Sequence, residues 1–252
     1  MVLMLEWAPC GLRHGPSHVL AWRRVCYEIL GLRVECVAEE EEGGLVAKRF
    51  RFRNDLLVTV RELPPTADNT TGLGVWDASI ALAAIAAACE NVPTSVLELG
   101  CGVALPSATL AQRGATVLAT DASDDLVDHA RRTLGIKAQV LHWQRPALEK
   151  TDFDLVIGAE VLYAASAVFP VASVLRTYAR DRVWIVGLAR RRPLLDKLID
   201  ALKDDFSFLS KPITISASSP DFNESSPSPQ RLTVDDQDRV QLLFLEGRRL
   251  TS

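Results

Sequence analysis

The chain has 252 residues, of which 48% are hydrophobic and 24% charged, with a formal net charge of −4 at pH 7. This balance is typical of one large globular domain. The acidic excess argues against a general nucleic-acid surface, so such a partner would need a local basic patch. The five cysteines show no C-x-x-C spacing, which argues against both a disulfide framework and a zinc site.

Residues 1–70 are expected to form an extension before the main domain. The amphipathic spacing of residues 16–31, which end in a glycine, predicts a helix. Alternating apolar residues over 33–63 predict antiparallel strands, and an acidic run followed by two glycines predicts a hairpin tip. The apolar start lacks a basic segment and the apolar run 78–89 is too short to cross a bilayer. We therefore expect a cytoplasmic or nuclear protein without a membrane partner.

Residues 71–252 are expected to form the main domain. Short apolar strands alternate with helices, which predicts a parallel sheet covered on both faces, and right-handed crossovers favour a doubly wound, Rossmann-like α/β fold. Two further strands, without a helix between them, are expected to pair antiparallel at one edge, so that the sheet has seven strands and an antiparallel last strand. A Ser- and Pro-rich stretch, 217–230, predicts an exposed loop between them. The predicted strands are 95–99, 116–120, 138–141, 154–159, 183–188, 211–216 and 239–246, and the predicted helices are 104–113, 123–134, 166–180 and 191–204.

A glycine turn follows the first strand of this domain. Residues 96–102 are VLELGCG, a buried strand that runs into Gly100 and Gly102. Ligands of open α/β sheets bind beyond the carboxyl ends of the strands, where the strand order reverses. Glycines let a ligand approach the backbone closely. The turn therefore predicts a site for a nucleotide-like cofactor.

Two details favour a sulfonium cofactor over a dinucleotide. Leu105 occupies the place of the third glycine in G-x-G-x-x-G, which a dinucleotide fold uses for close helix packing. Glu98 would suit the methionyl ammonium of S-adenosylmethionine and would repel a pyrophosphate. Asp121 ends the next strand, where a carboxylate accepts ribose hydroxyls of either cofactor. Alternatively, Glu98 is a charge satisfied by a backbone N–H or an arginine, and Asp121 caps the following helix.

Four segments resemble methyltransferase family 16, the seven-strand protein-lysine methyltransferases of the methyltransferase-like 21 type, which include elongation-factor-2 lysine methyltransferase. The resemblance covers roughly residues 70–190. Its segments are TGLGVWDAS at 71–79, VLELGCGVALPSATLAQRGATVLATD at 96–121, LHW at 141–143 and AEVLY at 159–163.

The resemblance implies a role for several residues. Trp76 would lie beside the methionine part of the cofactor, Trp143 would stack on the adenine, and Ala159 would border the cofactor. Each Trp could equally belong to the core. The family's acidic motif usually begins with Asp, whereas Glu160 here reaches one methylene further.

The implied reaction is methyl transfer to a lysine side chain of a protein, with S-adenosylhomocysteine as the product. Glu160 would orient the amine and Tyr163 would close the aromatic wall of the lysine channel. We expect a monomer without a metal site or a nucleic-acid partner. A small-molecule N- or O-methyltransferase and a catalytically silent cofactor-binding scaffold are the alternatives, because fold does not fix substrate.

Overall fold

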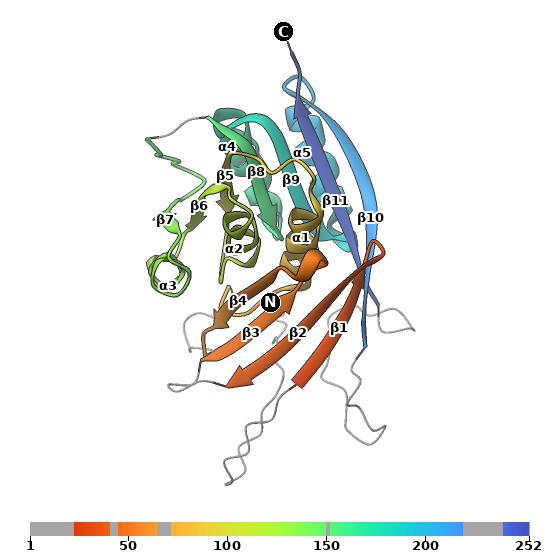
Figure 1. The fold of residues 1–252 in the computed structure, drawn as a ribbon. Helices are drawn as coiled ribbons and strands as arrows, with labels where there is room; N and C mark the ends of the chain where they lie inside the picture. Colours follow the sequence, from red (N-terminus) through yellow and green to blue (C-terminus); the bar gives the residue numbers. More distant parts are fainter. Residues whose placement is uncertain (1–22, 41–44, 65–71, 150–151, 219–238, 252) are drawn as a thin grey trace, which may run out of the picture.

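The computed structural model describes residues 23–40, 45–64, 72–149, 152–218 and 239–251. Within these ranges a single mixed sheet of eleven strands has the order β4-β3-β2-β1-β10-β11-β9-β8-β5-β6-β7 (Figure 1). The strands are β1 (Arg23–Ile29), β2 (Leu32–Glu40), β3 (Val46–Arg51), β4 (Leu57–Glu62), β5 (Ser95–Leu99), β6 (Thr116–Asp121), β7 (Lys137–Val140), β8 (Phe153–Ala159), β9 (Ala179–Leu188), β10 (Phe206–Ser218) and β11 (Arg239–Arg249). The helices are α1 (Asp77–Ala88), α2 (Leu105–Gln112), α3 (Asp124–Leu134), α4 (Val168–Tyr178) and α5 (Arg192–Leu202), with 3-10 turns η1 (Arg53–Asp55), η2 (Ala165–Ala167) and η3 (Ala189–Arg191).

The predicted parallel core is confirmed. Strands β9, β8, β5, β6 and β7 pair in parallel, and β5 lies between β6 and β8, so the strand order reverses there. The two late strands, β10 and β11, pair antiparallel with each other, and β11 pairs antiparallel with β9. The predicted loop 217–230 falls outside the described residues apart from its first two, which end β10.

The seven strands predicted for residues 71–252 are present as β5 to β11, but a seven-stranded sheet is not confirmed, because β1 to β4 extend it to eleven strands within the described residues. The predicted antiparallel strands of the extension, β2 to β4, are present, and β1 joins them to β10 with Ile29 opposite Ile215. The extension therefore continues the main sheet instead of standing apart from it. Whether residues 1–70 form a separate unit stays a prediction.

The predicted helix over 16–31 is also wrong where the structure describes it. Residues 23–29 form β1, and Leu30 and Gly31 form a two-residue hairpin turn with φ angles of 53° and 74°. A turn with two positive φ angles matches the twist of the strands that it joins. A glycine just beyond an amphipathic segment is typical of a helix end, but the same positive φ serves this hairpin. Residues 16–22 lie outside the described residues.

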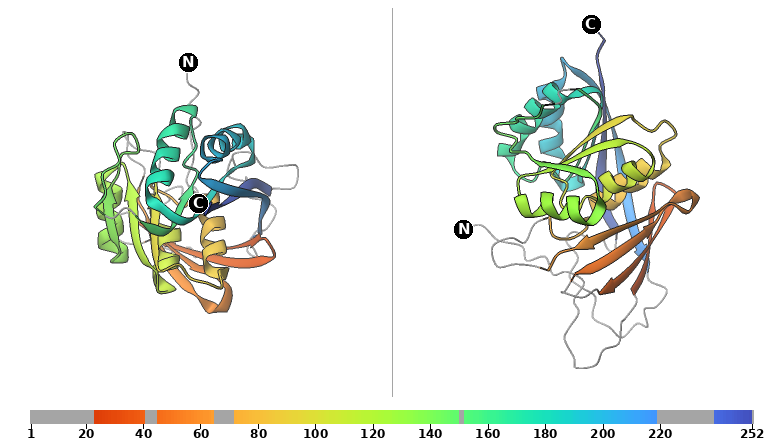
Figure 2. Two further views of the ribbon diagram at one scale, coloured as in Figure 1. Left: turned by 90° about the horizontal axis from the view of Figure 1, so that it is seen from above. Right: turned by 60° about the vertical axis from the view of Figure 1, so that its left-hand side comes forward.

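Helices cover both faces of the parallel core. Helices α1, α2 and α3 lie in front of the sheet in Figure 1, and α4 and α5 lie behind it; Figure 2 shows the same layers from two other sides. Helix α1 is rich in alanine and buried on nearly all sides, because it packs against the sheet, against α2 and against the turn η1 of the extension. Its small side chains permit this close double packing. No helix among the described residues is long and apolar enough to span a membrane.

Candidate cofactor site

The glycine turn follows β5, whose five residues are all buried. Gly100 and Gly102 have φ angles of 59° and 52°, in the left-handed region that favours glycine. A Cβ atom on Gly102 would lie 2.9 Å from the carbonyl oxygen of Gly72. Only glycine therefore fits here, because a side chain would push the Gly72 segment away from the turn.

A cavity of about 670 Å³ opens beyond the carboxyl ends of β5, β6 and β8, where the strand order reverses. Its volume falls within the range of small-molecule and cofactor sites. The lining comes from the glycine turn, the end of β6, the segment after β7 and the segment after β8. The lining residues are Gly72, Gly74, Trp76, Ser79, Gly100, Cys101, Gly102, Val103, Asp121, Ala122, Ser123, Leu126, Leu141, His142, Trp143, Gln144, Ala159, Glu160, Val161, Tyr163 and Arg191.

The structure brings nearly all the predicted site residues to this cavity, although they come from widely separated parts of the chain. One predicted residue, Glu98, does not line it. Those that line it are Trp76, Gly100, Gly102, Asp121, Trp143, Ala159, Glu160 and Tyr163.

Asp121 holds two backbone segments at the cavity wall. One carboxylate oxygen accepts the Gly102 N–H at 3.0 Å, and the other accepts the Ser123 N–H at 3.1 Å. The cap of α3 is Ser123, whose hydroxyl accepts from Leu126 N at 3.4 Å. Each carboxylate oxygen of Asp121 keeps a further lone pair toward the cavity, which suits a ribose hydroxyl.

Replacing Asp121 with alanine is expected to weaken S-adenosylmethionine binding about tenfold or more, because the ribose acceptor and the anchor of the glycine turn are lost together. Calorimetric titration measures the affinity. The matched control is Asp124→Ala, which removes an exposed carboxylate three residues further on. Equal affinities for the Asp121→Ala variant and the unmodified protein would remove Asp121 from the site.

Glu98 lies beneath the turn instead of on the cavity wall. Its side chain is buried, with 1% of the residue exposed, and accepts the Ser107 N–H in the first turn of α2 at 3.0 Å. The contact with Ser107 agrees with the alternative given for Glu98, a carboxylate satisfied by a backbone N–H. Burial raises the pKa of Glu98 to about 8, against which the hydrogen bonds from Ser107 act only in part. The predicted contact between Glu98 and the ammonium group of the cofactor is not seen, because Glu98 does not line the cavity.

Glu98 should make the protein less stable as the pH rises. Its pKa is about 8 in the folded chain against an ordinary value of 4.5 for glutamate, so the unfolded chain binds fewer protons between these values. The free energy of unfolding then falls by up to about 1.4 kcal/mol per pH unit across this window. Glu98→Gln should flatten this part of the curve, which denaturant unfolding between pH 5 and 8 measures. Parallel curves for the two proteins would contradict it.

Glu160 follows β8 with a φ angle of 54°, an uncommon conformation for a residue with a side chain. Its Oε1 accepts the Leu188 N–H at the end of β9. Its Oε2 lies 2.9 Å from Arg191 Nε in an ion pair, yet neither atom makes an aligned hydrogen bond within the described residues. Burial raises the pKa of Glu160, and the Leu188 N–H and Arg191 oppose that rise. The site thus holds a buried carboxylate with acceptor capacity to spare.

Aromatic side chains form the mouth of the cavity. The ring of Trp143 lies over the glycine turn, since a Cβ atom on Gly100 would be 3.4 Å from it. Tyr163 packs against Trp143 with ring centroids 6.4 Å apart, and 61% of Tyr163 is exposed. The Tyr163 carbonyl accepts a hydrogen bond from the Arg191 guanidinium. Trp143 and Tyr163 therefore form one wall, fixed from behind by Arg191.

Arg191 is the functional candidate that sequence reasoning missed. It lies in a run of three arginines after β9, where charge alone indicates a solvated surface. Only the fold brings it to Glu160, 31 positions earlier in the chain. The sequence offered one signal for Arg191, its position directly after a strand of a parallel sheet. Residues at the carboxyl end of such a strand lie at the edge of the sheet where ligands bind.

Part of the chain is similar to methyltransferases in sequence, and its fold is similar to that of solved methyltransferase structures. Residues 96–180 match the family model of a methyltransferase domain. A Pyrococcus horikoshii structure, described as a candidate RNA methyltransferase, has a TM-score of 0.51 and 17% identity, covering 75% of this chain and 93% of that chain. Magnesium protoporphyrin IX methyltransferase from Synechocystis has a TM-score of 0.48 and 20% identity, covering 68% and 78%. No curated protein matches the sequence.

The matched domain and the fold are similar to those of class I methyltransferases, the enzymes that use S-adenosylmethionine. The matched residues contain the glycine turn, Asp121 and Glu160. The observed geometry fits this cofactor, because the cavity beside the glycine turn has the volume of a cofactor site and Asp121 offers acceptors on its wall. Asp121 would hold the ribose, and Trp143 would border the adenine.

Proposed function

We propose that the chain transfers a methyl group from S-adenosylmethionine to a lysine side chain of a protein substrate. The observation that carries this proposal is the buried Glu160 carboxylate with a spare acceptor, at the cavity wall and beside the exposed ring of Tyr163. Bound S-adenosylmethionine supplies an electrophilic methyl group on a cationic sulfur. The chain must supply alignment of the nucleophile, which can account for several kcal/mol of the barrier.

A lysine amine can attack only after it loses a proton, and its reference pKa is about 10.4. An isolated carboxylate beside the amine would raise that pKa. Arg191 changes this balance, because its charge offsets that of Glu160 at 2.9 Å. The pair thus presents little net charge to an incoming amine. The spare lone pair on Glu160 Oε2 can still accept an N–H and direct the nitrogen lone pair toward the methyl group.

The aromatic wall supports a long aliphatic side chain as the guest. Trp143 and Tyr163 form an aromatic surface on the wall of the cavity that Glu160 also lines. The methylene stem of lysine can pack along such a surface with its polar end at the carboxylate. A small-molecule amine with a similar stem would satisfy the same contacts and is the alternative to be tested.

The decisive experiment incubates the protein with radiolabelled S-adenosylmethionine and a cell lysate. We expect label in a protein band and, by mass spectrometry, on a lysine of that protein. The Glu160→Gln variant is the control for contaminating activities. Label confined to small molecules would favour the alternative substrate class, and cofactor binding without transfer would indicate a silent scaffold.

A further inference from the structure

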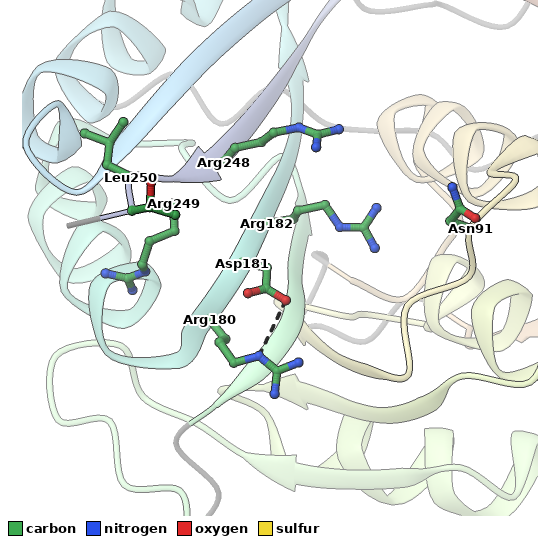
Figure 3. A pocket seen from close by; sticks show the side chains of 8 residues that line it. Asn91, Arg180, Asp181, Arg182, Arg248, Arg249 and Leu250 are labelled. Atoms are coloured by element: carbon green, nitrogen blue, oxygen red, sulfur yellow. Dashed lines mark hydrogen bonds and ion pairs between the residues drawn. The ribbon is translucent and has the colours of Figure 1, made fainter.

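A second hollow lies at the end of the sheet opposite the cofactor site. It has a volume of about 690 Å³ and opens where β9 begins and β11 ends (Figure 3). Four of its side chains are arginines, although the whole chain has a net charge of −4. The lining residues are Asn91, Arg180, Asp181, Arg182, Arg248, Arg249, Leu250 and Thr251.

Two of the four arginines are occupied by other contacts. Arg180 pairs with Asp154, with Asp181 at 3.4 Å and with Asp152 at 3.7 Å. Arg249 donates to the carbonyl oxygens of Ala179 and Arg176, and its guanidinium lies 4.5 Å above the ring of Phe206. These contacts tie strands and helices together and explain both residues without a ligand.

The other two arginines, Arg182 and Arg248, lie directly opposite each other on the antiparallel strands β9 and β11. Arg182 lies over the ring of Trp184, 5.8 Å from its centroid, and makes no hydrogen bond or ion pair within the described ranges. Arg248 has 69% of its side chain exposed and a single long contact to Glu246, at 3.5 Å. Like charges directly opposite each other destabilise a sheet, so this pair lowers stability in the absence of a counter-ion.

The two guanidinium groups extend in the same direction, toward Asn91 in the loop after α1 (Figure 3). Each guanidinium presents a planar fork of donors that matches phosphate oxygens. The Asn91 amide adds a neutral donor on the facing side. Two cationic forks and one amide suit a compact dianion, and a phosphate monoester carries a charge of about −1.5 to −2 at neutral pH.

We propose that Arg182, Arg248 and Asn91 form a binding site for a phosphate monoester group. The site is distinct from the cofactor cavity, because Arg182 lies in the first half of β9, six residues or about 20 Å before Leu188, which ends the strand beside Glu160. It stands independently of the proposed lysine substrate. A phosphorylated protein segment and a nucleotide carry the same group, and the experiment distinguishes these two sources.

The first measurement is calorimetric titration of the full chain with inorganic phosphate at low ionic strength. We expect binding that falls about tenfold or more in Arg182→Gln and in Arg248→Gln. Arg132→Gln, which removes an exposed arginine on α3, is the matched control and should bind as the unmodified protein does. Absence of binding at millimolar phosphate, or equal loss in the Arg132 variant, overturns the proposal.

A second measurement uses thermal unfolding without phosphate. Removing either opposed charge should raise the melting temperature by about 1 °C, because the repulsion is relieved. A fall in melting temperature for both variants would overturn the assignment, since it would give the arginines a structural role. A third measurement titrates the protein with a phosphoserine peptide and with a nucleoside monophosphate. The ligand that binds more tightly identifies the source of the phosphate group. If neither ligand competes with inorganic phosphate, the proposed site is overturned.

Discussion

Replacing Glu160 with glutamine is expected to slow methyl transfer by about 100-fold or more while cofactor affinity stays within about twofold. Gln can keep the contact to the Leu188 N–H through its amide oxygen. Its NH₂ group then replaces Oε2, so the acceptor for an incoming amine is lost and a donor faces Arg191. Single-turnover kinetics with radiolabelled cofactor measures the rate, and calorimetry measures the affinity.

Two further variants separate this effect from misfolding. Glu160→Asp keeps the carboxylate and tolerates the φ angle of 54° better than Glu does, so it should recover part of the activity. Glu149→Gln removes an exposed carboxylate in the segment between β7 and β8, away from the cavity lining, and should leave the rate unchanged. Equal loss of rate and cofactor affinity in Glu160→Gln would assign the residue a structural role.

Arg191→Gln should move the activity profile to higher pH. Arg191 opposes the effect of burial on Glu160, so its removal raises the pKa of that carboxyl group. The same removal leaves the negative charge of Glu160 uncompensated and raises the pKa of the bound amine. Both changes require a higher pH for the reactive state, in which Glu160 is ionised and the amine is neutral. An unchanged profile would separate Arg191 from the reaction.

Replacing Gly102 with alanine is expected to weaken S-adenosylmethionine binding by about 100-fold or more. The φ angle of 52° alone costs an alanine about 1–2 kcal/mol. The new Cβ would also lie 2.9 Å from the Gly72 carbonyl oxygen, and backbone cannot yield as a flexible side chain does. The turn and the Gly72 segment must therefore separate, which deforms the cavity. Calorimetric titration with the cofactor checks this result.

Gly135 provides the matched control for this substitution. It has a comparable φ angle of 64° at the end of α3, and a Cβ atom there would meet nothing within 4 Å. Gly135→Ala should lower stability by about 1 kcal/mol and leave cofactor affinity unchanged. Similar affinities for the Gly102 and Gly135 variants would contradict the prediction, because neither strain nor a clash at Gly102 would then disturb the cofactor site.

The sequence predicted the parts of the fold that local patterns specify. Strand β5 and the helices that follow it are set by apolar periodicity and by glycines at element ends. No local pattern predicts the register of β1 against β10, because the paired residues of the two strands are nearly 190 positions apart. The residues of β1 also carry an amphipathic spacing that suits a helix, and tertiary pairing overrides that preference.

Most residues of the cofactor site could be predicted because they lie at the ends of strands. Gly100, Gly102, Asp121 and Glu160 all lie at strand ends, so the fold rule for open sheets places them together. The same rule could not reveal that Glu98 points under the turn, since the direction of a buried side chain depends on packing. It also could not pair Glu160 with Arg191, a contact that exists only after β8 and β9 align.

The pairing of β1 with β10 also has a consequence for biosynthesis. During translation the extension leaves the ribosome first, yet its partner strand is made only after residue 206. The edge of β1 therefore stays open until after β5 to β9 have been made, and unpaired edges favour aggregation. A chain of such non-local contacts folds slowly. The protein thus closes its sheet only after β10 has been made, and premature termination before β10 would leave a nascent chain that chaperones must shield.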